Sequence, residues 1–342
     1  MPTNVSPEYK KAEQAFREAR EPADMLKCLK EMLRTIPKHK GTEHLQRDIK
    51  TRIKMLTDEL AGPRKGGART GPAHSVRPEG AAQIALLGPP NSGKPQLHHR
   101  LTGARSEIGP YPFTTQFLLP GMMPYEDIHF QLVDLPPISN DYFEPWVVNS
   151  LQTADAAFLV IDISNPECID HIDQVITQLE QRKVSLTDQF ETALENGVNT
   201  QDDPEFDPFR VALPTILIAN KIDMAADPDE LDALNELVNY NFPSIALSAL
   251  TGTNLELFPQ MVFEKLKIVR VYTKIPGKPP DTDKPFTLRF GGKVSDVARQ
   301  IHKDFEETFK FARIWGKNVF AGQQVGPDHL LDDLDILEIH VR

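Results

Sequence analysis

The sequence predicts an α/β protein in which a doubly wound, mainly parallel sheet lies between an N-terminal helical hairpin and a small C-terminal α+β domain. The main observation is a series of short aliphatic runs that alternate with helical stretches: "QIALLG", "IHFQLVD", "AAFLVID", "TILIAN" and "SIALSA". Runs that are apolar on both faces are typical of strands in a sheet covered by helices on both sides. The chain before this series is rich in helix formers, and the chain after it is strand-like again.

The first 80 residues predict a helical arm and a linker. In residues 1–61, apolar side chains recur at helical spacing, as in "DMLKCLKEML", and "TIPKHKG" interrupts the pattern. We therefore expect two or three helices that fold back on one another as a hairpin or coiled-coil arm. Residues 62–80 are rich in Gly, Pro and Arg without periodicity, which predicts a flexible linker.

Residues 81–268 carry the aliphatic runs and form the expected central α/β domain. Within it, the acidic segment 185–209 predicts an extension of the preceding helix followed by a surface excursion. Residues 269–342 contain the strand-like "IVRVYTKIPG" and "FTLRFGG", a helical stretch around Val294 to Phe305, and the final strand "DILEIHVR". The order strand, strand, helix, strand in so short a segment favours a small α+β domain.

The composition is that of a soluble globular protein, with 40% hydrophobic and 25% charged residues. No apolar run reaches the ~18 residues of a membrane span, and the N-terminus lacks the apolar core of a signal peptide. We therefore expect a cytoplasmic protein without a membrane partner. Cys28 and Cys168 lie far apart without CxxC spacing, so neither a disulfide framework nor a zinc site is predicted.

The charge is unevenly distributed along the chain. Residues 1–80 contain 17 basic and 11 acidic side chains, a balance of +6, whereas the net charge of the whole chain is −11. A basic arm on an acidic body favours a polyanionic partner such as RNA. A solvated helical face would have the same composition, so both interpretations stay open.

The stretch "GPPNSGK", from Gly88 to Lys94, has the spacing of a phosphate-binding loop. It follows one predicted strand and precedes a helix, as such a loop must. Glycines let the backbone wrap closely, the N–H groups and the helix N-terminus face the phosphates, and Lys94 supplies a positive charge.

Four further elements appear in the order that a guanine-nucleotide site requires. Asp134 ends the strand run "IHFQLVD", where a carboxylate can hold Mg²⁺ through water. In "NKID", Asp223 can accept hydrogen bonds from N1–H and the exocyclic amine of guanine, a donor pair that adenine lacks. The other two elements are a base-contacting backbone N–H in Ser248, Ala249 and Leu250, and a threonine that reaches Mg²⁺ and the γ-phosphate, Thr114 or Thr115.

These motifs, together with "YPFTT", "DLPP" and the C-terminal "FARIWGKNVFAGQQVGPDHLLDDLDILEI", make the chain similar to the Obg-related GTPases, and within them to the developmentally regulated GTP-binding (DRG) subgroup. The resemblance covers nearly the whole chain and implies a P-loop GTPase domain followed by a TGS domain, a ubiquitin-like β-grasp. It implies a slow GTPase associated with a ribosome, ribosomal RNA or a translation factor through the basic arm and the TGS domain, with no DNA partner.

The resemblance also implies a nucleotide site for GTP or GDP. Its Mg²⁺ would be held by Thr115 and Asp134, and Asn91 matches an asparagine that coordinates K⁺ in some relatives. No catalytic residue is assigned, and Lys94 and Thr115 have phosphate and switch roles. The expected nucleotide-binding residues are Gly88, Asn91, Ser92, Gly93, Lys94, Pro95, Gln96, Thr114, Thr115, Asp134, Asn220, Lys221, Asp223, Ser248, Ala249 and Leu250.

Two prolines depart from the family pattern. Pro95 stands where the family has a serine, and it lacks both the hydroxyl that binds Mg²⁺ and the N–H that meets the β-phosphate. Pro137 stands where the family usually has glycine, whose N–H bonds to the γ-phosphate. An alternative hypothesis is therefore a pseudo-GTPase, an interaction protein that binds GDP or GTP without efficient hydrolysis.

Overall fold

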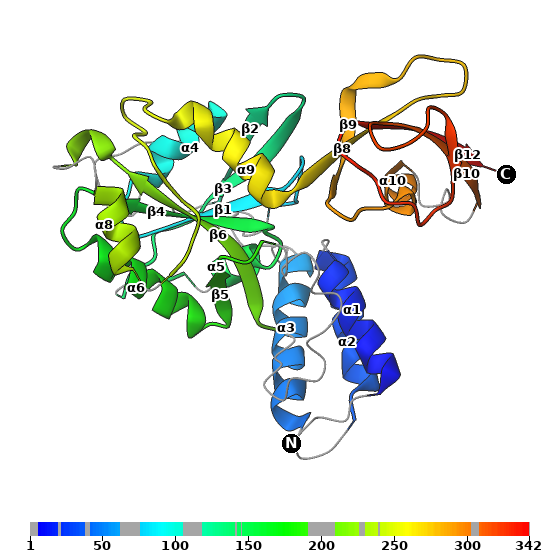
Figure 1. Ribbon diagram of the computed structural model, residues 1–342. Helices are drawn as coiled ribbons and strands as arrows, with labels where there is room; N and C mark the ends of the chain where they lie inside the picture. The colour runs from blue at the N-terminus through cyan, green and yellow to red at the C-terminus, as the bar shows by residue number, and fades with distance from the viewer. Residues whose placement is uncertain are drawn as a thin grey trace.

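The computed structural model describes residues 6–19, 22–37, 42–61, 76–104, 118–140, 142–144, 146–190, 209–225, 230–238, 240–301 and 308–341. These residues form an arm of three helices, a central α/β layer structure and a smaller C-terminal sheet, as Figure 1 shows. The α/β fold with helices before the sheet and a β-rich C-terminal domain after it is confirmed.

The arm consists of α1 (Pro7–Glu18), α2 (Pro22–Thr35) and α3 (Glu43–Ala61). Ser6 caps α1 by accepting the Tyr9 N–H, and prolines begin α1 and α2, where their missing N–H has no helical partner. The apolar faces of the three helices bury Tyr9, Phe16, Leu29, Met32 and Ile49 in a core of their own. Phe209, which precedes the central strand β6, completes this core and thus attaches the arm to the α/β layer.

The central sheet has the strand order β2-β3-β1-β4-β6-β5, with β7 also paired to β6. All of its pairs are parallel except β2 with β3, a hairpin. The strands are β1 (Gln83–Leu87), β2 (Leu119–Tyr125), β3 (Ile128–Asp134), β4 (Ala156–Asp162), β5 (Val184–Thr187), β6 (Val211–Asn220) and β7 (Ser244–Ala246).

Helices cover both faces of this sheet, which explains why its inner strands are apolar throughout. On one face, α4 (Lys94–Thr102) and α9 (Phe258–Leu266) bury Leu97, Phe258 and Val262. The other face is covered by α5 (Val147–Leu151), α6 (Cys168–Glu180) and α8 (Glu230–Leu237). The short 3-10 helices η2 (Ile222–Met224) and η3 (Leu255–Leu257) follow β6 and precede α9.

The C-terminal sheet has the order β11-β10-β12-β8-β9 around the helix α10 (Val294–Ile301). Val294 and Val297 of this helix are fully buried against the sheet. The strands are β8 (Ile268–Thr273), β9 (Asp281–Arg289), β10 (Phe309–Trp315), β11 (Gln323–Val325) and β12 (Asp335–Val341).

The structure differs from the sequence-based expectation at four strands. The helix extension expected at the start of the segment 185–209 is instead the strand β5, whose first residue, Val184, is buried and paired to Val211. A four-residue strand is too short to show a period, and the rest of the expected excursion, 191–208, lies outside the described residues. The strands β2, β10 and β11 were not expected. Of these, β2 is an edge strand that contains two prolines, and β10 alternates exposed and buried residues.

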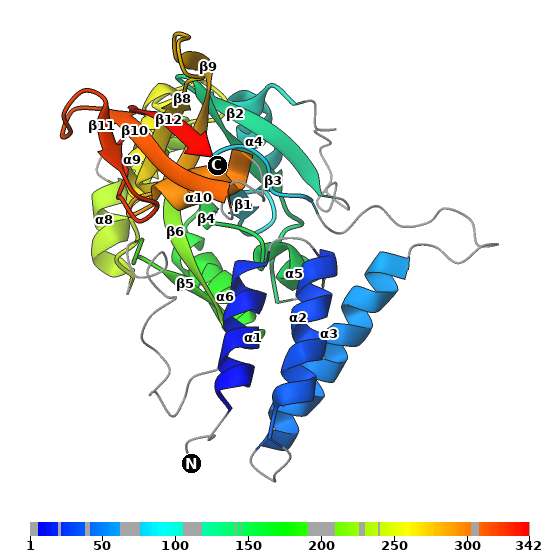
Figure 2. The same cartoon turned by 90° about the vertical axis from the view of Figure 1, so that its right-hand side faces the viewer.

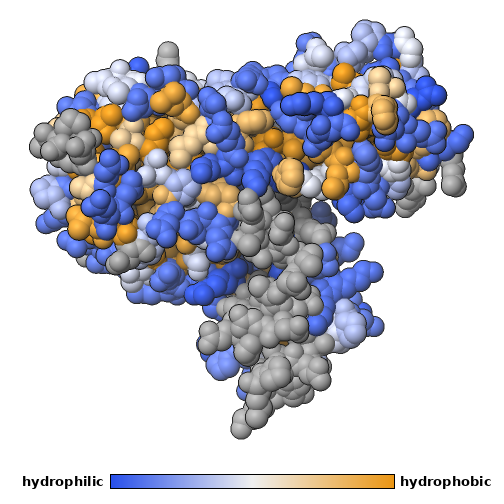
Figure 3. Space-filling view, in the orientation of Figure 1, coloured by the Kyte–Doolittle hydropathy of each residue, from blue (hydrophilic) through white to orange (hydrophobic). Residues whose placement is uncertain are grey.

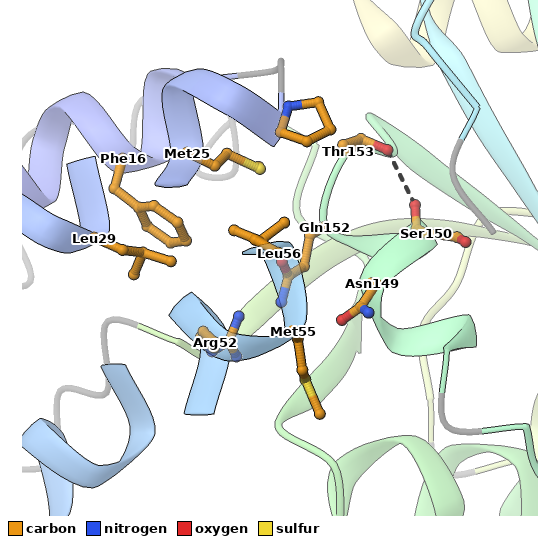
Figure 4. A pocket seen from close by; sticks show the side chains of 11 residues that line it. Phe16, Met25, Leu29, Arg52, Met55, Leu56, Asn149, Ser150, Gln152 and Thr153 are labelled. Atoms are coloured by element: carbon orange, nitrogen blue, oxygen red, sulfur yellow. Dashed lines mark hydrogen bonds between the residues drawn. The ribbon is translucent and has the colours of Figure 1, made fainter. Parts of the chain in front are cut away.

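The arm projects from the amino ends of the central strands, and the C-terminal sheet lies beside the same edge (Figures 1 and 2). At the arm junction, a cavity of about 40 Å³ is lined by Phe16, Met25 and Leu29 of the arm and by Asn149 and Gln152 of the central layer (Figure 4). It has room for one or two water molecules, so it is a packing gap in the junction.

On the face that Figure 3 shows, hydrophilic side chains alternate with apolar ones, and apolar side chains gather over the C-terminal sheet. Among the helices of the described segments, none has both the length and the apolar character needed to cross a bilayer.

Candidate functional site: a phosphate loop and a base-reading loop

The candidate site lies at the carboxyl edge of the central sheet, where β1, β3 and β6 end. This is the edge at which open α/β sheets bind ligands. The loop after β1, from Gly88 to Gly93, leads directly into α4. A Cβ atom on Gly88 would lie 2.2 Å from the carbonyl oxygen of Val160, and one on Gly93 would lie 2.3 Å from Nδ2 of Asn220. Both glycines have positive φ, so the loop requires them for its path as well as for its contacts.

Lys94 begins α4 and turns its side chain back over the loop. Its Nζ donates hydrogen bonds to the carbonyl oxygens of Gly88 (2.9 Å) and Pro89 (3.1 Å). Burial lowers the pKa of Lys94 to about 8, and the negative charge of Asp134 opposes this shift. A buried cation with so low a pKa is stabilised when a phosphate brings negative charge beside it.

The first turn of α4 supplies the remaining donors. The N–H groups of Lys94 and Gln96 have no acceptor within the helix, because the first intrahelical bond runs from Leu97 N–H to Gly93 O. Such a turn fits an anion. Pro95 lies in this turn and contributes no N–H, so one of its usual donors is missing.

Asn220, at the end of β6, joins two loops. Its Nδ2 donates to the carbonyl oxygen of Ser92 in the phosphate loop (2.8 Å). Its Oδ1 accepts the backbone N–H of Ala249 (3.0 Å). The side chain is buried, so a single amide sets the distance between the phosphate loop and the loop 248–250.

Asp223 is exposed at the mouth of the site and is oriented by one neighbour. The hydroxyl of Ser248 donates to Asp223 Oδ1 at 2.5 Å. A carboxylate held in this way can accept the paired donors of a guanine base. Lys221, which has a positive φ, forms an ion pair with Asp162 at the end of β4 (2.6 Å). Leu250 is 59% exposed beside these groups.

Asp134 is fully buried at the end of β3, near enough to Lys94 to influence its pKa. The following segment folds over the phosphate loop, since the N–H of Ile138 donates to the carbonyl oxygen of Gly88 (3.1 Å). Pro137 is buried in this segment and has no N–H to offer. Magnesium therefore fits in part, because Asp134 can hold it through water whereas Pro95 provides no oxygen ligand.

For three of the expected site residues, the structure does not bear on the predicted role. Thr114 and Thr115 lie outside the described residues. Asn91 is exposed at the tip of the loop with a φ of 62°, a conformation that asparagine tolerates. The structure thus accounts for Asn91 as a turn residue, and its proposed K⁺ role stays a prediction.

Two features of α4 were not evident in the sequence. Although a polar residue on a helix normally faces solvent, His98 is fully buried, with its Nε2 3.3 Å from the carbonyl oxygen of Leu132, and burial lowers its pKa. Arg100 contacts the carbonyl oxygens of Ala249 and Leu250. Nothing in the local sequence marks Arg100, because its partners lie about 150 residues further along the chain.

The phosphate loop is typical of the P-loop class of nucleotide-binding proteins. The positions of Asn220 and Asp223, at and just after the end of β6, are typical of the members of that class that bind guanine. The family model described as 50S ribosome-binding GTPase matches residues 83–190, and the TGS domain model matches residues 269–341. An uncharacterised GTP-binding protein of Methanocaldococcus jannaschii is 31% identical over 93% of this chain and 92% of its own length. The developmentally-regulated GTP-binding protein 1 of Xenopus laevis is 29% identical over 90% of this chain and 96% of its own.

The chain belongs to the DRG-type family of GTP-binding proteins with a C-terminal TGS domain. Among solved structures, a GTP-binding protein from Pyrococcus horikoshii aligns with 76% of this chain and 100% of its own, at 17% identity and a TM-score of 0.49.

Proposed function

We propose that this protein binds GTP and GDP and hydrolyses GTP slowly. The observation that carries the proposal is the pair of contacts made by Asn220, which joins the phosphate loop to the loop that orients Asp223. A loop for phosphates and a carboxylate for guanine, held at a fixed separation, match a guanine nucleotide and not an isolated phosphate. The names of the relatives support the same ligand.

The roles of the residues follow from the site geometry. Lys94 and the N–H groups of the first turn of α4 would neutralise the β- and γ-phosphates, and Gln96 would meet the α-phosphate. Asp223 would accept N1–H and the exocyclic amine of the base. Bound Mg²⁺ would neutralise phosphate charge, with Asp134 as a water-mediated ligand and Thr115 as the proposed direct one. No described side chain is assigned as the catalytic base, so positioning and charge neutralisation alone predict slow hydrolysis.

Binding of fluorescent GDP and GTP tests the proposal directly. The wild type is expected to bind both, and Asp223→Asn is expected to lose GDP and gain xanthosine diphosphate. Xanthine has a carbonyl where guanine has an amine, so an asparagine NH₂ can donate to it. Failure of the wild type to bind guanine nucleotides would refute the proposed function.

A measurement of GTP hydrolysis distinguishes a slow GTPase from a pseudo-GTPase, the alternative hypothesis that Pro95 and Pro137 suggest. Phosphate release in a single turnover, with K⁺ and then with Na⁺, is the measurement. Faster release with K⁺ that is lost in Asn91→Ala would support a K⁺ site. Binding without phosphate release, even in the presence of ribosomes, would establish the pseudo-GTPase.

We further propose that the chain divides into an arm (1–61), a linker (62–80), a G domain (81–268) and a TGS domain (269–342), and that it works on the ribosome in the cytoplasm. The partner would be ribosomal RNA or a translation factor. On α3, the exposed side chains Arg47, Lys50 and Lys54 follow one another at helical spacing, as a contact to RNA phosphates requires.

Cosedimentation with ribosomal subunits tests this partner. Changing Arg47, Lys50 and Lys54 together to glutamine is expected to weaken cosedimentation and to reduce its dependence on salt. Lys265→Gln, an exposed position on α9, is the control. Cosedimentation that the triple change leaves intact would remove α3 as the contact.

A further inference from the structure

We propose that Arg100 is a positioning residue for guanine recognition, and this inference rests on the proposed function. Arg100 lies near the C-terminal end of α4, the helix that begins with Lys94, which is proposed to bind phosphate. Its Nε donates to the carbonyl oxygen of Ala249 at 3.0 Å, and its Nη2 donates to the carbonyl oxygen of Leu250 at 2.5 Å. The planar guanidinium thus spans two successive carbonyls of the loop 248–250, the proposed base-reading loop, which the point charge of a lysine cannot do.

By holding the two carbonyls, Arg100 also fixes the directions of the next N–H groups, those of Leu250 and Thr251, because each lies in the same peptide plane as one of the carbonyls. In a planar trans peptide the C=O and the next N–H point in opposite directions. Holding the Ala249 carbonyl therefore directs the Leu250 N–H away from Arg100. The Ala249 N–H is directed to Asn220, so the Leu250 N–H is the next donor in the loop that a guanine oxygen can meet.

The second peptide plane, between Leu250 and Thr251, is connected to Asp223 through Ser248. Holding the Leu250 carbonyl fixes the N–H of Thr251, which donates to Ser248 Oγ at 3.1 Å. Because that oxygen accepts from Thr251, the hydroxyl proton of Ser248 is free to point at Asp223, to which it donates. Arg100 thereby acts on both base-reading groups, one through each peptide plane.

The loop 248–250 is held from two sides, by Asn220 on the side of the sheet and by Arg100 on the side of α4. Ser248 N–H donates to Thr253 O and Gly252 N–H to Ser248 O, so the loop closes on itself. Asn220 anchors it on the sheet side. Without Arg100, the carbonyls of Ala249 and Leu250 would turn toward water, and both peptide planes would be able to rotate. The helix α4, through Arg100, therefore helps Asn220 to place the phosphate-binding and base-reading groups relative to each other.

Dissociation of fluorescent GDP from the full chain tests the proposal. Arg100→Ala is expected to weaken GDP binding about tenfold, Arg100→Lys by less, and the control Arg313→Ala, an exposed arginine of β10, not at all. In a Ser248→Ala background, Arg100→Ala should weaken GDP binding by about threefold or less. The hydrogen bond from the Ser248 hydroxyl, through which Arg100 would act on Asp223, is already absent there. Equal effects in the two backgrounds would overturn the proposed route.

Hydrogen exchange of the nucleotide-free protein keeps this inference separate from the proposed function. Arg100→Ala is expected to speed exchange of the Thr251 and Gly252 amides while leaving the amides of β1 unchanged. Unchanged exchange at Thr251 and Gly252 would overturn the role of Arg100, whether or not the wild type binds GDP. A wild type that fails to bind GDP refutes the nucleotide function alone.

Discussion

The guanidinium of Arg270 in β8 lies 3.0 Å from the carboxylate of Asp127 in the turn between β2 and β3, although 143 residues separate them. The same guanidinium bonds to Asp333 through Nε (3.0 Å) and Nη2 (2.7 Å), and it also pairs with Glu126. Tyr272 donates its hydroxyl proton to the other oxygen of Asp127. The C-terminal sheet is thus attached to the turn of one hairpin of the central sheet.

That hairpin extends from the candidate site to this junction. Asp134 and Leu119 pair at its open end, beside the phosphate loop, whereas Glu126 and Asp127 form its turn at the opposite edge of the sheet. Tyr125, at the end of β2, also contacts Phe263 of α9, with ring centroids 5.1 Å apart. A two-stranded ribbon therefore joins Asp134, the carboxylate of the proposed Mg²⁺ site, to the C-terminal domain.

Removal of the Arg270 side chain is expected to destabilise this junction by about 3 kcal/mol. The side chain is only 8% exposed, and its loss leaves Asp333 and Asp127 without their cation. Urea unfolding followed by the fluorescence of Trp315, in a Trp146→Phe background, measures the change for Arg270→Ala. Lys293→Ala is the matched control, because its partner Asp328 is 84% exposed, and a loss below about 0.5 kcal/mol is expected. Equal effects of the two changes would contradict the structural role of Arg270.

The inner strands were predictable from the sequence because their burial is uniform. Ile84, Phe158 and Ile218 lie between helices on both faces, so their strands contain unbroken apolar runs. In the edge strand β2 the burial of the side chains varies from residue to residue, and the strand contains Pro120 and Pro124. It therefore has no apolar run by which the sequence could predict it.

The residue types of the candidate site were predictable, but the partners of those residues were not. Spacing indicated that Asn220 and Asp223 belong to one motif, whereas their bonds to Ser92 and Ser248 depend on how distant loops meet. The burial of His98 was missed for a related reason. A polar residue on a helix is expected to face solvent, but Gly121 of the unrecognised β2 and Leu132 of β3 lie against the His98 ring.

The ionisation of Lys94 predicts how pH affects the nucleotide-free protein. Its pKa is lowered to about 8 in the folded state, from about 10.5 when unfolded, so between these values the unfolded chain binds more protons. Stability should therefore rise as pH increases from about 8 to about 10.5, and Lys94→Met should abolish this rise. Thermal unfolding across this pH range measures it. A flat profile in the wild type would show that Lys94 keeps its ordinary pKa.

The same group predicts proton uptake when a phosphate ligand binds. Above pH 8 the free site holds a partly neutral Lys94, and a phosphate beside it favours the charged form. GDP affinity should therefore fall as pH rises above about 8, with protons taken up on binding. Calorimetry in two buffers of different ionisation enthalpy at pH 8.5 measures the uptake, and Lys94→Met should show neither binding nor uptake.

Replacement of Pro137 is expected to improve discrimination between GTP and GDP. Pro137→Gly restores an N–H in the segment that folds over the phosphate loop, where a γ-phosphate would accept it. The ratio of GTP to GDP affinity should rise by about tenfold, the equivalent of one charge-assisted hydrogen bond. Pro136→Ala adds an N–H one position earlier and serves as the control. A ratio that both variants raise equally would reflect a looser segment and not a specific donor.

Replacement of Pro95 separates the two functions that a serine would have there. Pro95→Ala restores only the backbone N–H in the first turn of α4, whereas Pro95→Ser restores the N–H and a hydroxyl that can bind Mg²⁺. The alanine variant should bind GDP about tenfold more tightly with or without Mg²⁺, because its gain is a hydrogen bond to the β-phosphate. The serine variant should gain further only when Mg²⁺ is present.

Dissociation of fluorescent GDP with EDTA or with millimolar Mg²⁺ distinguishes these outcomes for Pro95. If the serine and alanine variants behave alike in Mg²⁺, the hydroxyl does not reach the metal, which Asp134, through water, and the proposed Thr115 would then hold without residue 95. If neither differs from the wild type, residue 95 does not face the phosphates, because even the added N–H would have met the β-phosphate.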